Sequence, residues 1–454
     1  MKKLFGTDGM RGVAGRFPLD AETVRMAGLS LARRLGAAPR IVTGRDTRES
    51  GTWIEAAFAD GARAGGAHCE SAGVITTPGV AYLARTLPAD AGVVVSASHN
   101  PYEDNGIKIF APTGRKLDDA TERLIEADIY EARGQRAGNS SGQETKKAAA
   151  HDEGDGRAAT LRQLYLDYLM DEIAGGLRLN GMKLVVDCAN GAAAELAPAL
   201  FARLGAQVES VGVEPDGRNI NHECGSLFVE RLCERVKSAG TQLGIAFDGD
   251  ADRALFVDAR GEVVDGDATM WVLAQHLAAR GELAGAAVVA TVMSNIGLEL
   301  ALRGRDIKLI RADVGDKYVL EELLKTGASV GGEQSGHIIM PRISLAGDGI
   351  ITTLFVLKAM REAGKELHEL TEGFVRYPQV LVNVRVAEKR PFQDVPEVAE
   401  EARCTEVALA GRGRLLLRYS GTEPLARVMI EGERQEEIEC LANDLASTIK
   451  RALG

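Results

Sequence analysis

The chain has 454 residues, enough for about three domains of roughly 150 residues each. Its formal net charge of −11 at pH 7 argues against nucleic acid or an anionic membrane surface as a partner. Six scattered cysteines form no C-x-x-C pair, and the N-terminus shows no signal-peptide-like apolar segment. We therefore expect a cytoplasmic protein with neither a disulfide framework nor a zinc site.

Short apolar runs alternate with longer amphipathic segments, a pattern typical of α/β layers. Apolar residues recur at three- and four-residue spacing after Asp20, which predicts a helix that begins there. Ligands of open α/β sheets bind at the carboxyl ends of the strands, so the polar loops after the apolar runs are the expected site. These runs lie at 41–42, 92–95, 183–186, 243–247 and 288–292.

Two regions depart from this pattern. Residues 133–159 have no apolar periodicity and predict an irregular connection. After about residue 373, valines alternate with other residues over 380–386, which predicts a half-exposed strand. An apolar face over 438–449 predicts a final helix, so the last part of the chain is expected to be a separate α+β domain.

The segment S-A-S-H-N-P over 96–101 follows the buried run 92–95. A serine at a strand end can serve as nucleophile and phosphate carrier, which makes Ser98 the candidate, with His99 beside it. The alternative is an ordinary turn in which the serine is a local cap. The continuation D-N-G-I-K returns Lys108 to the same neighbourhood, where it could lower the pKa of Ser98 or act as a general base.

Asp248, Asp250 and Asp252 alternate in a loop after an apolar run, which can place three carboxylates around a hard divalent cation. An EF-hand is excluded because its sixth position would be Arg253 and its twelfth Ala259. Mg²⁺ fits best, since it tolerates an incomplete protein shell and accepts phosphate oxygens. An aspartyl-phosphate hydrolase with Asp248 as the nucleophile remains open on these residues alone.

The segment G-G-E-Q-S-G-H over 331–337 has glycines on both sides of a polar patch. One interpretation is a tight surface turn. The functional one has Glu333 and Ser335 holding sugar hydroxyls or an amine, with His337 as a nearby donor.

A third cluster lies in the last domain, where hydroxyls, backbone N–H groups and arginines could form a phosphate cradle. A plain Ser-Gly turn with solvated arginines is the alternative. A glycine-punctuated turn over 6–12 presents one more arginine, Arg11. The residues of the cradle are Arg418, Ser420, Gly421, Thr422 and Arg427.

Taken in this order, the motifs resemble those of the α-D-phosphohexomutase superfamily over nearly the whole chain. The likeness rests on F-G-T-D-G-M-R-G at 5–12, on 96–108, on D-G-D-A-D-R at 248–253 and on R-Y-S-G-T-E-P at 418–424. The segment E-Q-S-G-H at 333–337 is similar to the sugar loop of the bacterial branch that acts on glucosamine phosphates, and G-D-K-Y-V-L at 315–320 also resembles that branch.

The resemblance implies an α/β fold with three similar domains built on mixed sheets, and a C-terminal α+β domain like that of the TATA-binding protein. The whole would be heart-shaped with a central cleft. The implied domains are 1–157 with the phosphoserine loop, 158–260 with the metal loop, 261–372 with the sugar loop and 373–454 with the phosphate cradle.

The activity implied by the resemblance is the interconversion of glucosamine 6-phosphate and glucosamine 1-phosphate, which feeds UDP-N-acetylglucosamine synthesis. Ser98 would carry the phosphoryl group, and glucosamine 1,6-bisphosphate would be the intermediate and activator. Mg²⁺ would be held by the three aspartates and the phosphoserine oxygen, while Lys108 and Arg11 would act near the reacting hydroxyl. A homodimer stays open.

Tyr419 stands where the family commonly has proline, and this difference could loosen the cradle or add a backbone donor.

Three rival functions remain at this point. They are phosphoglucomutase or phosphomannomutase activity in the same superfamily, a metal-dependent sugar-phosphate hydrolase, and a non-catalytic sugar-phosphate sensor.

Overall fold

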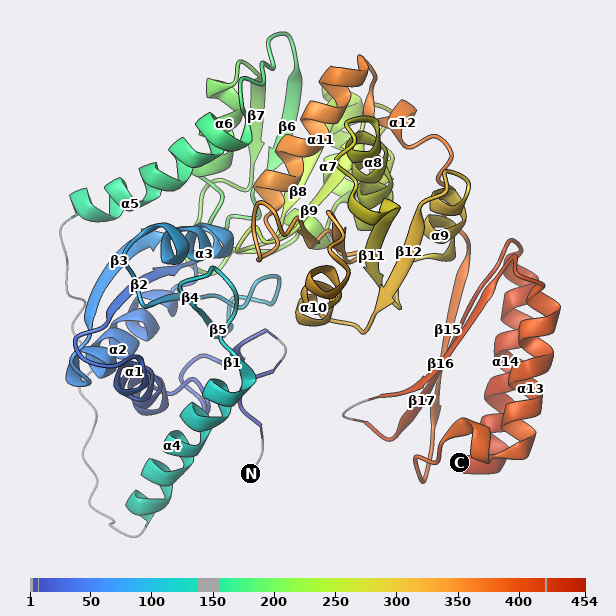
Figure 1. Cartoon of the computed structure of the whole chain (residues 1–454), viewed down its shortest axis with the longest axis horizontal. Coiled ribbons are helices and arrows are strands. Elements are labelled where there is room, and N and C mark those ends of the chain that lie inside the picture. The colour runs from blue at the N-terminus through green and yellow to red at the C-terminus, as the bar shows by residue number, and fades with distance from the viewer. Residues whose placement is uncertain (1–2, 7, 138–154, 421–422) are drawn as a thin grey trace. The chain divides into compact units, whose positions relative to one another are not determined.

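The computed structural model describes residues 3–6, 8–137, 155–420 and 423–454 (Figure 1). These residues form two compact bodies. The first comprises Met1–Thr291 and Ala312–Thr371, and the second comprises Val292–Arg311 and Glu372–Gly454. Helices and mixed sheets alternate along the chain, which confirms the predicted α/β class.

The first sheet has the strand order β1-β5-β4-β2-β3. Strand β2 is parallel to both β3 and β4, whereas β5 is antiparallel to β4. The side chain of Asp20 accepts a hydrogen bond from the Thr23 N–H and begins α1, as the sequence predicted. The elements are β1 (Met10–Val13), α1 (Ala21–Leu35), β2 (Arg40–Arg45), α2 (Gly51–Ala64), β3 (His68–Val74), α3 (Thr77–Thr86), β4 (Ala91–Val95), β5 (Asp104–Phe110) and α4 (Asp119–Ala137).

The second sheet repeats this topology in the order β10-β9-β8-β6-β7. Strand β6 is parallel to β7 and β8, and β9 returns antiparallel to β8. The elements are α5 (Asp155–Asp167), the π-helix η1 (Tyr168–Ile173), β6 (Lys183–Asp187), α6 (Leu196–Arg203), β7 (Gln207–Val211), the short helix η2 (Gly225–Leu227), α7 (Glu230–Ala239), β8 (Leu243–Phe247), β9 (Ala254–Asp258) and β10 (Val263–Val264).

A third sheet contains the same parallel pair and antiparallel return, because β11 is parallel to β13 and β14 is antiparallel to β13. The loops β4–β5, β8–β9 and β13–β14 therefore occupy equivalent places in three similar units. They carry the serine, aspartate and sugar motifs respectively. The elements are α8 (Gly266–Ala279), η3 (Ala284–Ala286), β11 (Ala287–Thr291), α10 (Asp316–Thr326), β13 (Gly331–Gly332), β14 (Ile338–Ile339), α11 (Gly349–Ala363) and α12 (Leu367–Leu370).

The second body has a three-stranded antiparallel sheet of order β15-β17-β16. Burial alternates along β15, and α14 buries Ile438, Leu445 and Ile449, so the predicted strand and final helix are confirmed. The elements are α9 (Ile296–Arg303), β12 (Lys308–Ala312), β15 (Gln379–Arg385), η4 (Phe392–Asp394), α13 (Pro396–Leu409), β16 (Arg414–Tyr419), β17 (Leu425–Glu431) and α14 (Gln435–Leu453).

The irregular connection predicted over 133–159 is wrong at both ends, because α4 continues to Ala137 and α5 begins at Asp155. Polar helices of low amphipathicity leave little periodic signal in a sequence. Residues 138–154 lie outside the described part of the chain.

The boundaries of the four domains stay predictions, and the boundary at 157/158 falls within α5. Among the described residues no helix is both long enough and apolar enough to span a membrane.

Candidate active site

Ser98 lies in the β4–β5 loop with its side chain almost fully buried. Its Oγ donates a hydrogen bond to Asp248 Oδ2 at 2.5 Å, and its backbone N–H donates to Ser96 Oγ at 2.9 Å. The backbone of Ser98 has a φ of 54°, which costs a side-chain-bearing residue on the order of 1 kcal/mol. The surrounding loop therefore holds the hydroxyl in one orientation against a local preference.

Arg48 is the residue that holds this loop, and it is fully buried. Its Nε donates to Asp46 Oδ2 at 2.9 Å, and its Nη2 donates to the carbonyls of Ser98 and Asn100 at 2.9 and 2.8 Å. Its Nη1 donates to the carbonyl of Asp104 at 3.1 Å. The planar fork of a guanidinium can serve several acceptors at once, so one side chain ties the whole loop together.

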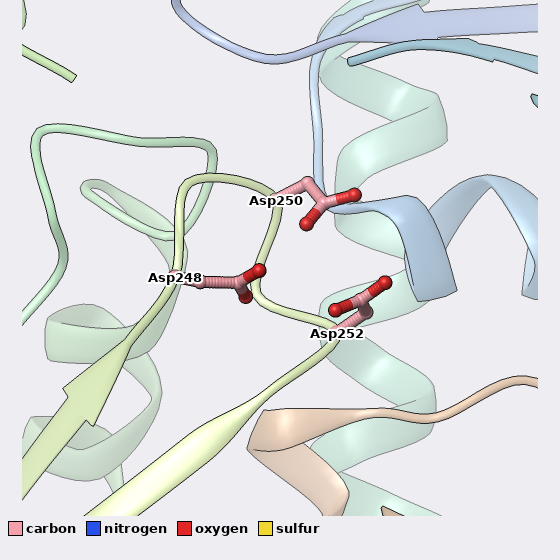
Figure 2. A group of neighbouring side chains, drawn as sticks. All are labelled: Asp248, Asp250 and Asp252. Carbon is pink, nitrogen blue, oxygen red and sulfur yellow. The ribbon is translucent and has the colours of Figure 1, made fainter. Parts of the chain in front are cut away.

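The carboxylates of Asp248, Asp250 and Asp252 converge in the β8–β9 loop (Figure 2), with ligand oxygens within 4.8 Å of one another. Among the described residues, Oδ1 of Asp250 and Oδ1 of Asp252 are buried without a hydrogen-bond partner. Burial, followed by the charges of Asp252 and Asp250, raises the pKa of Asp248 well above its usual value. Buried, crowded carboxylate oxygens with free lone pairs fit a hard divalent cation.

Two close approaches bring the first unit and the aspartate loop together. A Cβ on Gly249 would lie 2.6 Å from the Ser98 carbonyl oxygen, so only glycine lets the backbones pass at this distance. From the first unit, Thr77 Oγ1 donates to Asp250 Oδ2 at 2.6 Å and the Thr77 N–H donates to the Asp250 carbonyl at 3.0 Å. Thr77, at the start of α3, thus orients a predicted metal ligand.

Lys108 on β5 is buried against three carboxylates. Its Nζ lies 2.9 Å from Asp250 Oδ2, 3.2 Å from Asp252 Oδ2 and 3.0 Å from Asp8 Oδ2. Burial alone would lower the pKa of Lys108, but these three charges outweigh it and raise the pKa well above its usual value. The ammonium therefore neutralises the acidic cluster, and a general-base role for Lys108, which needs the neutral amine, stays a prediction.

Sequence reasoning missed Asp8, Lys116 and Asp316, which join Lys108 in a chain of alternating charges. Lys116 Nζ donates to both Asp8 and Asp316. Asp8 also pairs with Arg11. Asp8 lies in the G-T-D-G motif and Asp316 in the G-D-K-Y-V-L segment, so both had a signal in the sequence. Lys116 had none, and only the fold brings it to the two aspartates.

His337 links the sugar loop to this network. Its Nδ1 lies 3.5 Å from Asp252 Oδ1 and its Nε2 lies 3.8 Å from Asp316 Oδ2. Burial alone would lower the pKa of His337, but the charge of Asp252 and then that of Asp316 raise it to about 9. The imidazolium is thus a fixed positive charge near neutral pH.

The hydroxyl of Ser98 also contacts His99, which lies in the field of two arginines. His99 Nδ1 lies 3.2 Å from Ser98 Oγ, and burial followed by the charges of Arg253 and Arg11 lowers the pKa of His99 to about 4. Arg253, which sequence reasoning placed in the motif but not in the site, has Nε 3.8 Å from Asp252 Oδ1. Neutral His99 and two arginines suit a site that receives a phosphoryl group.

Glu333 and Ser335 occupy the β13–β14 loop. Glu333 Oε1 accepts from the Gly315 N–H at 3.1 Å, and Ser335 Oγ donates to Glu333 Oε2 at 3.2 Å. A Cβ on Gly266 would lie 2.0 Å from the Glu333 carbonyl oxygen, so α8 begins with glycine where it meets this loop. The two candidate sugar-binding side chains are therefore in contact with each other and held by backbone.

In the second body, Arg418 on β16 stands directly opposite Arg427 on β17. Burial and the charge of Arg427 lower the pKa of Arg418, and Arg427 Nε is buried without a hydrogen-bond partner among the described residues. Like charges directly opposite each other destabilise a sheet unless an anion joins them. Ser420 lies at the same end of β16, while Gly421 and Thr422 lie outside the described residues.

Tyr419, the departure from the expected proline, makes contacts that proline lacks. Its hydroxyl donates to the Arg390 carbonyl at 2.5 Å, and its ring stacks on Phe392 with centroids 4.2 Å apart. These contacts fix the cradle strand against the segment around η4. A proline here would instead restrain the backbone through its fixed φ.

Four profiles of the phosphoglucomutase/phosphomannomutase family match the chain. Alpha/beta/alpha domains I, II and III match residues 2–136, 163–261 and 265–377, and the C-terminal domain matches 381–448. Among solved structures, a phosphoglucomutase/phosphomannomutase family protein of Burkholderia thailandensis is similar in fold, with a TM-score of 0.78, 23% identity and coverage of 99% of this chain and 97% of that one. An Aspergillus fumigatus N-acetylphosphoglucosamine mutase, in complex with GlcNAc-6P and magnesium, gives a TM-score of 0.63 at 19% identity, covering 99% and 96% of the two chains.

Sequence relatives are nearer. The phosphoglucosamine mutase of Solibacter usitatus is 49% identical over 456 residues, covering 100% of this chain and 99% of the relative. That of Geobacter sp. strain M21 is 46% identical over 457 residues with the same coverage. Full-length identity at this level, together with the four matched domains, shows that the chain belongs to the phosphoglucomutase/phosphomannomutase family of enzymes, in its phosphoglucosamine mutase branch.

Proposed function

We propose that this enzyme interconverts glucosamine 6-phosphate and glucosamine 1-phosphate by way of a phosphoryl group carried on Ser98. The observation that carries the proposal is the placement of Ser98 Oγ against Asp248 of the aspartate cluster. His99 lies beside the hydroxyl, and the charges of Arg253 and Arg11 act on His99. The whole-chain likeness to phosphoglucosamine mutases supports the choice of reaction and sugar.

In the forward reaction the bond between phosphorus and Ser98 Oγ breaks while a bond forms to the sugar 1-hydroxyl oxygen. The sugar hydroxyl loses its proton, and Oγ gains one and returns to the hydrogen bond with Asp248. The resulting 1,6-bisphosphate reorients in the site. The bond between phosphorus and the sugar 6-oxygen then breaks while a bond forms to Ser98 Oγ. Oγ loses its proton, the 6-oxygen gains one, and glucosamine 1-phosphate leaves. Arg11 and Arg253 would bind the charged oxygens of the phosphoryl group in transit.

The three aspartates and an oxygen of the phosphoserine would together hold Mg²⁺, and the two unpartnered oxygens of Asp250 and Asp252 support this assignment. The ion would supply positive charge to the phosphoryl oxygens. Glu333 and Ser335 would bind the sugar, with the carboxylate of Glu333 suited to a protonated amine. Arg418, Ser420 and Arg427 would bind the phosphate that is not being transferred, together with Gly421 and Thr422.

The substrate is thus a phosphorylated sugar, and the product of the reaction serves UDP-N-acetylglucosamine synthesis. We propose that the enzyme is cytoplasmic. The nearest rival is the same chemistry on glucose or mannose phosphates. Glu333 and Gln334 favour the amino sugar, because a carboxylate gains a charge-assisted hydrogen bond from an amine that a hydroxyl does not offer.

The test is a comparison of kcat/KM for glucosamine 6-phosphate, glucose 6-phosphate and mannose 6-phosphate, with intact-mass analysis of the purified enzyme. We expect a preference for the amino sugar of at least about tenfold, the size of one charged hydrogen bond. A Glu333→Gln variant should lose that preference while keeping activity on glucose 6-phosphate. A wild-type preference for mannose 6-phosphate would refute the sugar assignment, and steady phosphate release without isomerised product would indicate a hydrolase.

A further inference from the structure

A cavity of about 470 Å³ lies where η1, α8 and α11 come together in the first body. Helices α8 and α11 pack side by side, and α11 also contacts η1 (Figure 1). The cavity is bounded by the loop 174–178 that follows η1, the end of α8 and the last turns of α11. None of its lining residues belongs to the candidate active site. Its volume lies in the range of small-molecule sites.

The lining of this cavity is positively charged although the chain as a whole carries −11. Four basic and two acidic side chains face it, a net charge of +2. Arg280 pairs with both acidic residues, with Nε 3.0 Å from Glu282 Oε1 and Nη1 3.0 Å from Glu362 Oε2. The other three basic residues therefore account for the excess charge.

Those three, Arg178, Lys358 and Arg361, are each held by a backbone carbonyl. Arg178 Nη1 donates to the Leu177 carbonyl at 3.0 Å, Lys358 Nζ to that of Ile173 at 2.5 Å and Arg361 Nη2 to that of Asn180 at 2.8 Å. Within the described part of the chain none of the three has a carboxylate within ion-pair distance. Each cation thus keeps most of its donors for a ligand.

The surroundings of Lys358 also favour an anion. Burial, followed by the charge of Arg280, lowers the pKa of Lys358, and the opposing charges of Glu362 and Glu282 offset only part of this shift. A Cβ on Gly175 would lie 3.7 Å from Lys358 Nζ, so the glycine loop after η1 lies against the ammonium. An anion bound here would offset the repulsion between neighbouring cations.

One side of the cavity is aromatic. Phe355 is half-buried, and Lys358 Nζ lies 5.2 Å from its ring centroid. The His276 ring meets Phe355 edge-on, with centroids 6.5 Å apart. An aromatic face beside clustered cations suits a ligand that combines a flat ring with phosphate groups.

Basic residues near helix C-termini are common because they offset the helix dipole, and this accounts in part for Lys358 and Arg361 at the end of α11. It does not account for Arg178, which lies in a loop. A loop arginine and two helix cations converge on one cavity whose two carboxylates pair with Arg280. This convergence is the feature that a purely structural role leaves unexplained.

We propose that this cavity binds a nucleotide, with Arg178, Lys358 and Arg361 contacting its phosphates and Phe355 stacking on its base. The cavity is separate from the candidate active site, so a bound nucleotide would act as an effector. An enzyme that cannot bind the nucleotide should still transfer phosphoryl groups when sugar phosphate is the only ligand present.

The test uses the full-length enzyme with Mg²⁺ and isothermal titration of UDP, ADP and inorganic pyrophosphate. Three proteins are compared. They are wild type, the double variant Arg178→Gln/Arg361→Gln, and Arg418→Gln, which alters the proposed substrate cradle in the other body. Both changes in the double variant are at exposed positions, and thermal melting verifies that it folds. The variant Phe355→Leu tests the stacking contact separately.

We expect at least one nucleotide to bind wild type and Arg418→Gln equally, and the double variant at least tenfold more weakly. Phe355→Leu should weaken nucleotide but not pyrophosphate, and mutase activity without nucleotide should be unchanged in the double variant. The proposal is overturned if no nucleotide binds, if binding is lost in Arg418→Gln and kept in the double variant, or if pyrophosphate binds but nucleotides do not. A failure of the proposed mutase activity would not affect these titrations, so the two proposals stand or fall separately.

Discussion

Ser98 and Asp248 are 150 positions apart in the chain, yet the Oγ of one donates a 2.5 Å hydrogen bond to the carboxylate of the other. Each lies in the loop that follows the second strand of a parallel pair. That strand is β4, paired with β2, in the first sheet and β8, paired with β6, in the second. The fold therefore uses the same loop of two similar units to bring the proposed nucleophile and an acidic cluster together.

Replacing Ser98 with alanine should abolish mutase activity and remove the covalent phosphate. The fold should persist, since the change deletes only the two hydrogen-bond contacts of the hydroxyl, to Asp248 and His99, each worth about 1 kcal/mol. Intact mass, circular dichroism and a coupled assay for glucosamine 1-phosphate measure the three outcomes. Ser210→Ala, at an exposed position of β7, is the control and should behave as wild type. Turnover by Ser98→Ala above background would rule out the covalent mechanism.

A second prediction concerns the repulsion among the three aspartates. In the presence of a chelator, Asp248→Asn should raise the free energy of unfolding by about 1 kcal/mol, because a neutral amide replaces a buried carboxylate. Burial and the charges of Asp252 and Asp250 raise the pKa of that carboxylate, so its ionised form opposes folding. The same variant should lose activity and the stabilisation that Mg²⁺ gives wild type.

Urea denaturation with and without Mg²⁺ provides the measurement. Asp60→Asn, which removes a partly exposed carboxylate of α2, should show neither effect. If Asp248→Asn were less stable than wild type in the chelator and still stabilised by Mg²⁺, the assignment of this cluster as a cation site would be wrong.

The extent to which these sites could be predicted depends on whether a residue's role is local. Ser98, the aspartates and the sugar loop follow buried strands in contiguous motifs, and contiguous motifs survive in a sequence without an alignment. Arg48 gave no such signal. Arg48 lies just beyond the apolar run 41–42 that the sequence analysis noted. Its contacts are the carbonyls of Ser98 and Asn100, which only the folded chain brings close to it.

The same limit applies to the internal repeat. The three sheets share a strand pattern, but the residues on equivalent strands differ, so no identity repeat was visible along the chain. Sheet topology is set by which strands pair, and pairing partners are far apart in sequence. Helices α4 and α5 were missed at their ends for another reason. The sequence there consists mostly of polar residues, alanine and glycine, which give little apolar periodicity.

Arg427→Gln tests the phosphate cradle. Removing one of two opposed arginines should leave the unliganded protein equally or slightly more stable, by a few tenths of a kcal/mol. KM for glucosamine 6-phosphate should rise roughly 10- to 100-fold, the size expected for a charged hydrogen bond to phosphate, with a smaller change in kcat. Arg403→Gln, an exposed arginine on α13, is the control. An unchanged KM would remove Arg427 from the substrate site.

Glu122 in the first turn of α4 should make stability depend on pH. Burial, followed by the charge of Asp119, raises the pKa of Glu122 from 4.5 to about 7. An acid whose pKa is higher in the folded state opposes folding once it is ionised. The penalty is therefore absent below pH 4.5, grows between pH 4.5 and 7, and is complete above pH 7.

Glu122→Gln removes that penalty. The variant should match wild type in urea denaturation at pH 4.5 and exceed it at pH 8, while Glu397→Gln, a first-turn glutamate of α13, should show no such difference. A stability gain of the same size at both pH values would show that the glutamate charge is not the cause.

Arg48→Lys should impair catalysis through the position of Ser98. A lysine ammonium is a compact donor that cannot reach the carbonyls of Ser98, Asn100 and Asp104 together, so the loop loses contacts that hold Ser98 at its φ of 54°. We expect a stability loss of about 1–3 kcal/mol and a fall in kcat of roughly 100-fold, since a displacement on the order of 1 Å has that effect.

Arg45→Lys is the matched control for this change, because Arg45 lies at the end of β2 and makes an ion pair with Glu55 at 2.6 Å rather than contacts to the serine loop. It should keep kcat near the wild-type value. The KM for sugar phosphate should change little in either variant, because neither residue lies in the proposed sugar or phosphate contacts. A rise in KM with unchanged kcat in Arg48→Lys would mean that Arg48 acts on substrate binding and not on the nucleophile.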